Sequence, residues 1–110
     1  MKNVFYLSFL ISMLFLNSCT PEKTELLTSK SNDGEMVVTV QGSRYSSMDP
    51  YEVQVDVAIN DKVIEASTEV YADKLDASNV DFNWRDDRNL IIAFTHRDGK
   101  VTTVPVSVQE

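Results

Sequence analysis

The chain has 110 residues, with 10 Lys or Arg against 17 Asp or Glu, so its formal net charge is −7 at pH 7. Nucleic-acid binding needs a cationic surface that neutralises phosphates, and this charge argues against a nucleic acid as partner. The length allows one small domain, and a single cysteine excludes a disulfide within the chain.

Residues 1–18 have the layout of a secretory signal peptide. Lys2 places a positive charge near the start, an apolar run extends over residues 4–16, and the small residue Ser18 ends the segment. A helix as long as that run rises about 20 Å, which is short of the ~30 Å hydrocarbon core of a bilayer. The pattern therefore predicts a cleaved signal helix rather than a permanent membrane span.

A cysteine follows the signal directly, in the order Leu16, Asn17, Ser18, Cys19. This pattern resembles the lipobox of bacterial lipoproteins, although Asn17 departs from the small or β-branched residue usual at its place. The resemblance implies cleavage before Cys19, a diacylglyceryl thioether on its sulfur and attachment to the membrane of a bacterial cell envelope. An ordinary secretory signal with an incidental cysteine is the alternative.

Cleavage after residue 18 would remove Lys2 and no acid, which leaves 9 Lys or Arg against 17 Asp or Glu, a net charge of −8. Electrostatic docking on anionic lipid is then disfavoured, so the acyl chains are expected to provide the anchor. Thr20 stands where lipoproteins retained in the inner membrane typically carry aspartate. By resemblance to lipoprotein sorting, the outer membrane is favoured if the cell has two membranes.

Residues 19–33 are predicted to form a flexible, lipid-anchored tether, and residues 34–110 the domain. The tether segment is polar and has no sustained hydrophobic period. Fully extended, residues 20–32 would reach roughly 40 Å. Leu26 and Leu27 are the exception, because they could open a first strand that turns back through residues 32–34.

From residue 35 onward the apolar residues recur with a period of two, which predicts β-strands. The clearest strand covers residues 51–59, and Asn60 with Asp61 forms a plausible two-residue hairpin turn after it, since both residue types tolerate positive φ. That turn predicts a register in which apolar residues mostly face apolar or small ones: Ile59 with Lys62, Val57 with Ile64, Val55 with Ala66, Val53 with Thr68 and Tyr51 with Val70.

Four further strands are expected at residues 36–41, 80–84, 90–94 and 101–108. Residues 90–94 are apolar on both faces, which is typical of a central strand. Asp98-Gly99 predicts a tight hairpin, and Pro105 removes a ladder donor and indicates an edge strand. Leu75 is expected to plug the core from a connecting segment. These patterns predict an all-β fold, a small antiparallel meander of about six strands forming a sandwich or a partly open barrel.

The hairpin at residues 60–61 also sets carboxylates against each other on the face away from the core. Asp56 falls opposite Glu65, and Glu52 falls opposite Glu69. Like charges directly opposite each other are destabilising. A basic protein partner or a divalent cation would offset this repulsion, and a solvated face screened by salt is the third interpretation.

Arg44 and Tyr45, in a polar loop predicted over residues 42–50, are the other candidates for contact with a partner. His96 is the only histidine, and Cys19 is assigned to lipid. A catalytic base needs a nucleophile or an acid within reach, and a zinc site needs three or four ligands. The sequence therefore suggests no catalytic residue, metal site or cofactor.

Trp84 alternates in phase with Val80 and Phe82, which predicts that it packs in the core. Asp86 and Asp87 are expected to accept local backbone hydrogen bonds in a turn. With the strands around them, these residues resemble one blade of a propeller repeat and are similar to short, uncharacterised β-rich bacterial lipoproteins. That resemblance implies antiparallel β-structure.

The sequence thus predicts a non-catalytic, lipid-anchored protein of the cell envelope. Its membrane contact is the lipid on Cys19, and its further partner is expected to be a protein. An immunity protein, an inhibitor or an accessory subunit of an envelope complex would fit. The alternative is a lipoprotein that binds a saccharide, another small ligand or a divalent cation.

Overall fold

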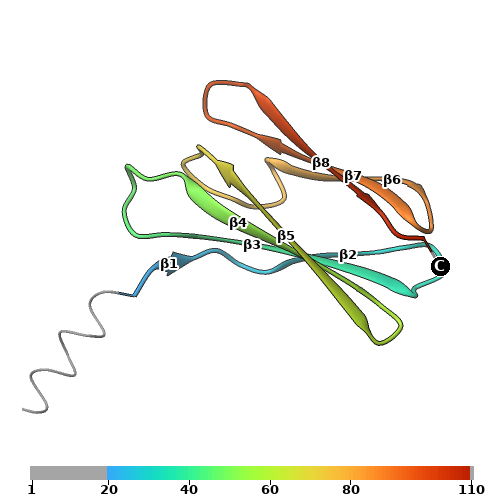
Figure 1. Ribbon diagram of the computed structural model, residues 1–110. Helices are drawn as coiled ribbons and strands as arrows, with labels where there is room; N and C mark the ends of the chain where they lie inside the picture. The colour runs from blue at the N-terminus through green and yellow to red at the C-terminus, as the bar shows by residue number, and fades with distance from the viewer. Residues whose placement is uncertain (1–19, 110) are drawn as a thin grey trace, which may run out of the picture.

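A computed structural model describes residues 20–109 of the chain. The predicted signal helix and the lipobox, Cys19 included, lie outside the described residues. Within residues 20–109 the chain forms eight β-strands in two antiparallel sheets that do not close into a barrel (Figure 1). The prediction of an all-β antiparallel fold is therefore confirmed. In this part of the chain, no helix is long and apolar enough to cross a membrane.

The first sheet has the order β1-β3-β4-β5, with β2 pairing with β3 beside β1, and the second sheet has the order β6-β7-β8. The strands are β1 (Glu22–Lys23), β2 (Leu27–Lys30), β3 (Met36–Arg44), β4 (Tyr51–Ile59), β5 (Lys62–Val70), β6 (Val80–Asp86), β7 (Asn89–Thr95) and β8 (Val101–Ser107). The central position predicted for residues 90–94 and the edge position predicted for the strand with Pro105 are both confirmed.

The hairpin between β4 and β5 has the predicted register along its whole length. Ile59 pairs with Lys62 across a two-residue turn, and every predicted pair as far as Tyr51 with Val70 is present. Asn60 has a φ of 53° and, within the described part of the chain, is the one non-glycine residue with positive φ. Asn60 therefore adopts the left-handed region that the prediction allowed for both loop residues, and Asp61 does not.

β1 and β2 belong to the first sheet, so residues 22–23 and 27–30 are not part of a flexible tether as predicted over residues 19–33. Glu22 pairs with Arg44, and β2 pairs with β3 from Leu27–Val40 to Lys30–Val37. The backbone of β3 gains hydrogen-bond partners along its second edge, and these satisfy groups that would otherwise need water. Residues 20–109 therefore contain eight strands rather than about six, and the first strand suggested by Leu27 is present as β2.

The core lies between the two sheets. It consists of alternate residues of β3 and β4, the ends of β5 and β6, the connection between them and the inner face of β7: Met36, Val38, Val40, Tyr51, Val53, Val55, Val57, Ile59, Val70, Ala72, Leu75, Val80, Leu90, Ile92 and Phe94. Leu75 plugs this core as predicted. Its Cδ2 would lie 2.8 Å from a Cβ placed on Gly42, so β3 accepts only glycine there without a shift of Leu75. Trp84 is half-buried against the core.

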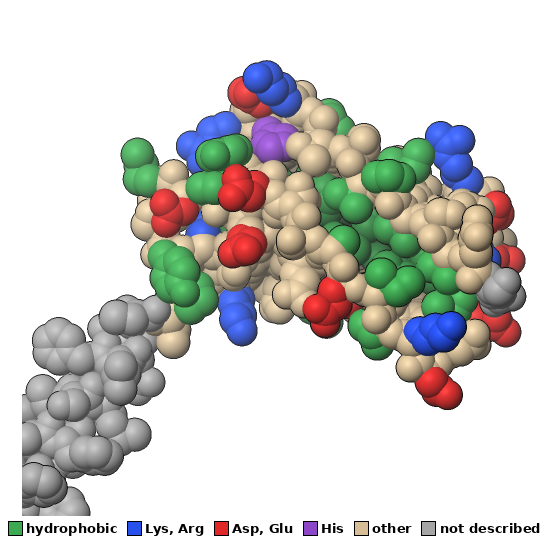
Figure 2. Space-filling model, viewed as in Figure 1, with side chains coloured by type: hydrophobic (Ala, Val, Ile, Leu, Met, Phe, Trp, Pro, Cys, Tyr) green, Lys and Arg blue, Asp and Glu red, His purple; other side chains and the backbone are tan. Residues whose placement is uncertain are grey.

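Side-chain and backbone hydrogen bonds join the two sheets at both ends. At one end the Arg88 guanidinium bridges the Asp33 and Glu35 carboxylates, at 3.0 and 2.6 Å. At the other, the Tyr71 carbonyl accepts the Arg97 N–H, at 2.7 Å. Figure 2 shows hydrophobic side chains exposed between the sheets on the side viewed there. The sandwich is thus closed at its ends and open along one side.

Asp33 forms several of the contacts at the end of the sandwich where Arg88 joins the two sheets. Its Oδ1 accepts the Ser31 hydroxyl at 2.6 Å and the Glu35 N–H at 3.0 Å. The Ser31 hydrogen bond, then the Glu35 N–H and the Arg88 guanidinium, hold the pKa of Asp33 below its ordinary value. The folded state therefore favours the ionised carboxylate, and the stability that it contributes depends on pH.

We expect acid to remove the contribution of Asp33. Because its pKa is lower when the chain is folded, that contribution is fully present above about pH 4 and is lost as the pH falls toward the lowered pKa. Asp33→Asn cannot ionise, so its urea midpoint should fall less than the wild-type midpoint between about pH 6 and pH 3. Glu25→Gln, which removes an exposed carboxylate outside this junction, is the control and should keep the wild-type fall. An Asp33→Asn variant as acid-sensitive as the wild type would contradict the assignment.

Candidate functional site

The four acids predicted to face each other do so on the outer side of the first sheet. Asp56 is the cross-strand partner of Glu65, and Glu52 is that of Glu69. We call these four residues the acidic face. Glu52, Glu65 and Glu69 are exposed and Asp56 is half-buried. Within residues 20–109, none of the four carboxylates forms an ion pair, so the structure places negative charges opposite each other without a directly bound cationic side chain.

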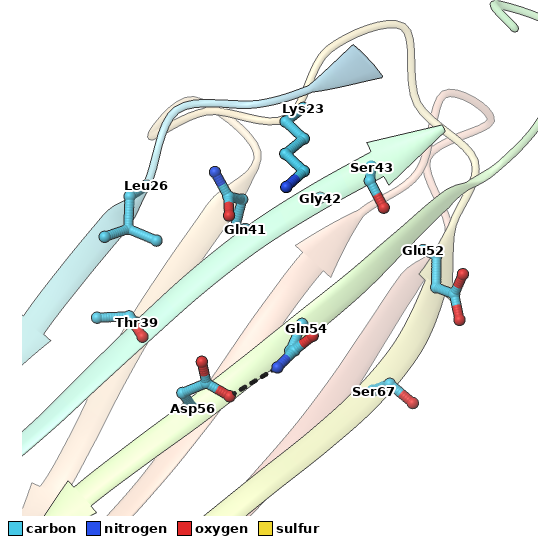
Figure 3. Close-up of a pocket in the computed structure, with 10 residues that line it drawn as sticks. All are labelled: Lys23, Leu26, Thr39, Gln41, Gly42, Ser43, Glu52, Gln54, Asp56 and Ser67. Carbon is cyan, nitrogen blue, oxygen red and sulfur yellow. Dashed lines mark hydrogen bonds between the residues drawn. The ribbon is translucent and has the colours of Figure 1, made fainter. Parts of the chain in front are cut away.

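A polar hollow of about 350 Å³ lies beside the acidic face (Figure 3). Its lining comes from β1, the segment after it, β3, β4 and β5: Lys23, Leu26, Thr39, Gln41, Gly42, Ser43, Glu52, Gln54, Asp56 and Ser67. The Gln54 amide donates to Asp56 Oδ1 at 3.1 Å, which orients that carboxylate. Except for Leu26 and Gly42, the hollow offers charged or hydrogen-bonding side chains.

The wall of the hollow next to β3 is held by the segment between β1 and β2. The Thr24 N–H donates to the Gly42 carbonyl, and the Gly42 N–H donates to Thr24 Oγ1, both at 2.9 Å. The Gln41 amide donates to the Thr24 carbonyl at 3.0 Å. This segment lies in the region predicted to be a tether, so the sequence interpretation missed it as part of the surface.

A second hollow, of about 200 Å³, brings Tyr45 next to the acidic face. Tyr45 shares its lining with Glu52 and Glu69, and the Tyr45 side chain is 76% exposed. The two regions that the sequence marked separately for partner contact, the loop and the acidic pairs, are therefore neighbours. An exposed aromatic ring beside carboxylates can contact apolar and cationic groups together.

Arg44, the other residue predicted for partner contact, has a structural position instead. It is the last residue of β3, and only 8% of it is exposed. Its guanidinium donates to the carbonyls of Ala72 and Asp73, both at 3.1 Å, and lies 4.1 Å from the centroid of the Tyr51 ring. The predicted loop thus starts after Arg44 rather than at Gly42. Every second residue from Met36 to Arg44 is buried. The sequence did not show this alternation at the end of the strand, because the residues there are polar or glycine.

His96 is half-buried where β7 ends, and its ring joins two segments. Its Nδ1 accepts the Tyr71 N–H at 3.1 Å, and its Nε2 lies 2.6 Å from Thr102 Oγ1. In the β6–β7 turn, Asp86 Oδ1 accepts the Arg88 N–H at 2.9 Å, as the turn interpretation predicted. Asp87 Oδ1 instead accepts the N–H of Asp33, a residue distant in the chain, at 3.2 Å. Among the described residues, no three His, Cys, Asp or Glu side chains are placed to hold a metal ion.

An apolar groove along the open side of the sandwich is a feature that the sequence did not predict. It lies between β5 of the first sheet and β8 of the second and has a volume of about 150 Å³. We call it the β5–β8 groove, and its apolar lining includes Val55, Val57, Ile64, Ala66, Val104 and Val106. The spacing of Ile64 and Ala66 places them on the inner face, but no sequence pattern shows how far the second sheet covers them.

Comparisons with known proteins do not place the chain in a family. A scan against protein-family models finds no match, and searches of curated proteins and of solved structures find none either. The function must therefore be inferred from the chain's own residues and their geometry.

Removing one acid from a facing pair should stabilise the fold. Asp56 and Glu65 are direct cross-strand neighbours, and a like-charge pair of this kind costs about 0.5 kcal/mol. Glu65→Gln should raise the free energy of unfolding by about that amount at low salt, and by less in about 1 M NaCl, where charges are screened within roughly 3 Å. Urea titrations at both salt concentrations measure this, with Glu25→Gln as the control. A gain that salt leaves unchanged would rule out charge repulsion as its cause.

Proposed function

We propose that this chain is a lipid-anchored, non-catalytic protein of a bacterial cell envelope that binds a basic protein partner through its acidic face. The basic partner is inferred from one observation: the carboxylates of the two facing pairs form no ion pair among residues 20–109. The order Leu16 to Cys19, directly after an apolar segment, supports the lipid anchor.

The repulsion within the acidic face supports a cationic partner because it would be relieved on binding. Lys or Arg side chains placed between the facing acids would convert two repulsive pairs into attractive ones, and complementary charge also accelerates encounter. Tyr45, beside Glu52 and Glu69, adds an aromatic contact of a kind enriched at protein interfaces.

Charge is distributed unevenly over the outer side of the first sheet. Its lysines, Lys23 and Lys30, are on β1 and β2, whereas the acidic face occupies β4 and β5. A basic partner is therefore expected over β4 and β5. An immunity protein, an inhibitor and an accessory subunit of an envelope complex all act by binding of this kind.

The lipid anchor has a direct chemical test. Mass spectrometry of the native N-terminus should find residues 1–18 removed and a diacylglyceryl-modified Cys19, and Cys19→Ala should give a soluble or unprocessed protein. Two or more acyl chains make membrane attachment effectively permanent, so the difference between the variants should be nearly complete in membrane fractionation. An unmodified thiol, or a Cys19→Ala protein that matures and still partitions with membranes, would refute the anchor.

The acidic face is tested by two variants of equal net charge. Glu65→Gln with Glu69→Gln removes two acids from the acidic face, and Glu25→Gln with Asp81→Asn removes two exposed acids from other places. Affinity capture from detergent-solubilised membranes identifies the partner, and titration with the purified partner gives Kd. The first double variant should bind about tenfold more weakly, equivalent to about 1.4 kcal/mol, and the second should bind like the wild type. Equal losses in both would show a net-charge effect rather than a binding face.

A further inference from the structure

The free edge of β5 carries two different chemistries on its two sides. The inner side chains Ile64 and Ala66 line the β5–β8 groove, and Ile64 remains 48% exposed although its partner Val57 is buried. The outer side chains include Glu65 and Glu69 of the acidic face. One strand edge is therefore apolar toward the groove and anionic toward solvent.

The backbone of the same edge has unused hydrogen-bonding capacity. β5 is the last strand of its sheet and pairs with β4 alone among the described strands. In an antiparallel ladder every second residue turns its N–H and C=O away from the partner strand, so β5 presents a row of these groups outward. The two-residue turn makes Ile59 and Lys62 a hydrogen-bonded pair, so the outward groups belong to every second residue from Val63 onward. The row borders the groove, because Ile64 and Ala66, which line the groove, alternate with these residues along β5.

We propose that β5 accepts an added β-strand from a protein partner whose side chains alternate between apolar residues and Lys or Arg. This proposal rests on the proposed function and specifies the form of the basic partner. The added backbone pairs with the edge of β5. Its apolar side chains enter the β5–β8 groove beside Ile64, and its cationic side chains lie opposite Glu65 and Glu69 on the outer face.

Charge argues against a second copy of the chain as the occupant, and charge with backbone chemistry favours β5 over β8 as the strand that accepts the added strand. A second copy of the chain would set its own Glu65 and Glu69 beside those of β5, which like-charge repulsion opposes. Pairing with β8 is disfavoured because Pro105 lacks a donor and residues 101–107 contain no acid that could attract a basic strand. The combination of an apolar inner side and an acidic outer side occurs on β5.

Fluorescent peptides test the alternation. The probe is a seven-residue peptide in which lysine alternates with valine, and its matched control has the same composition with the lysines and valines in separate blocks. Anisotropy is measured with the purified protein in detergent micelles, and empty micelles are the blank. We expect the alternating peptide to bind at least tenfold more tightly than the block peptide. Methylation of its backbone nitrogens, or exchange of lysine for glutamate, should cause a loss of similar size.

Two adjacent positions provide the matched protein variants. Ile64→Ser changes a side chain of the groove, and Val63→Ser changes its neighbour on the outer face, which is 63% exposed. Ile64→Ser should weaken binding of the alternating peptide about tenfold and Val63→Ser should leave it unchanged. Glu65→Lys with Glu69→Lys should reverse the preference toward the glutamate peptide. Thermal unfolding establishes that each variant is folded, and hydrogen exchange should show β5 amides protected by the peptide.

The outcomes separate this proposal from the proposed function. Equal binding of both lysine peptides, unaffected by Ile64→Ser, overturns strand addition and leaves a charge-driven acidic face in place. Equal binding of the lysine and glutamate peptides overturns the basic donor. If β5 amides are already protected in a dimer of the protein alone, a second copy is the occupant and the proposal is wrong. If no peptide binds, strand addition is overturned, and only the capture experiment then bears on the acidic face.

Discussion

The pairing of β4 with β5 determines both the interior of this protein and the charge on its surface. A turn of two residues at Asn60 and Asp61 fixes the register, and in a strand each side chain points opposite to its neighbour. A slip of one residue would turn the inner face of β5 outward and set buried valines against glutamates. The sequence can therefore keep this core only by holding Asp56 against Glu65 and Glu52 against Glu69. The repulsion follows from the fold, and the cationic partner proposed above would relieve it without changing the register.

The two sheets are held together differently at their ends and along their sides. Arg88 with Asp33 and Glu35 joins them at one end, and Tyr71 with the chain after β7 joins them at the other. One long side is linked by the Trp84 indole N–H, which donates to Ser29 Oγ at 2.8 Å. The other long side ends in the β5–β8 groove. Polar links at the ends maintain the spacing of the sheets, so an apolar opening persists where no strand covers it.

Local patterns predicted the strands that make hairpins, because alternation and turn chemistry act over a few residues. β4, β5 and their register followed from this, as did the central place of β7 and the edge position of Pro105. β1 and β2 were not predicted with their pairing, since short polar strands are fixed by their long-range pairing with β3. Arg44 was predicted in an exposed loop because its burial relies on carbonyl groups of Ala72 and Asp73, which are distant in the chain. How far one sheet covers the other depends on residues distant in the chain, so the sequence of a single strand could not predict the groove.

The early start of β1 has a consequence for where the domain sits. Thr20 and Pro21 alone separate Cys19 from the first paired residue, a span of roughly 10 Å when extended. A lipid on Cys19 would therefore hold the domain close to the headgroups. Because neighbouring strands are about 4.8 Å apart, β5 lies only some 14 Å across the sheet from β1. A protein bound at β5 would then lie within a few nanometres of the bilayer, close enough for a partner anchored in the same membrane to reach it.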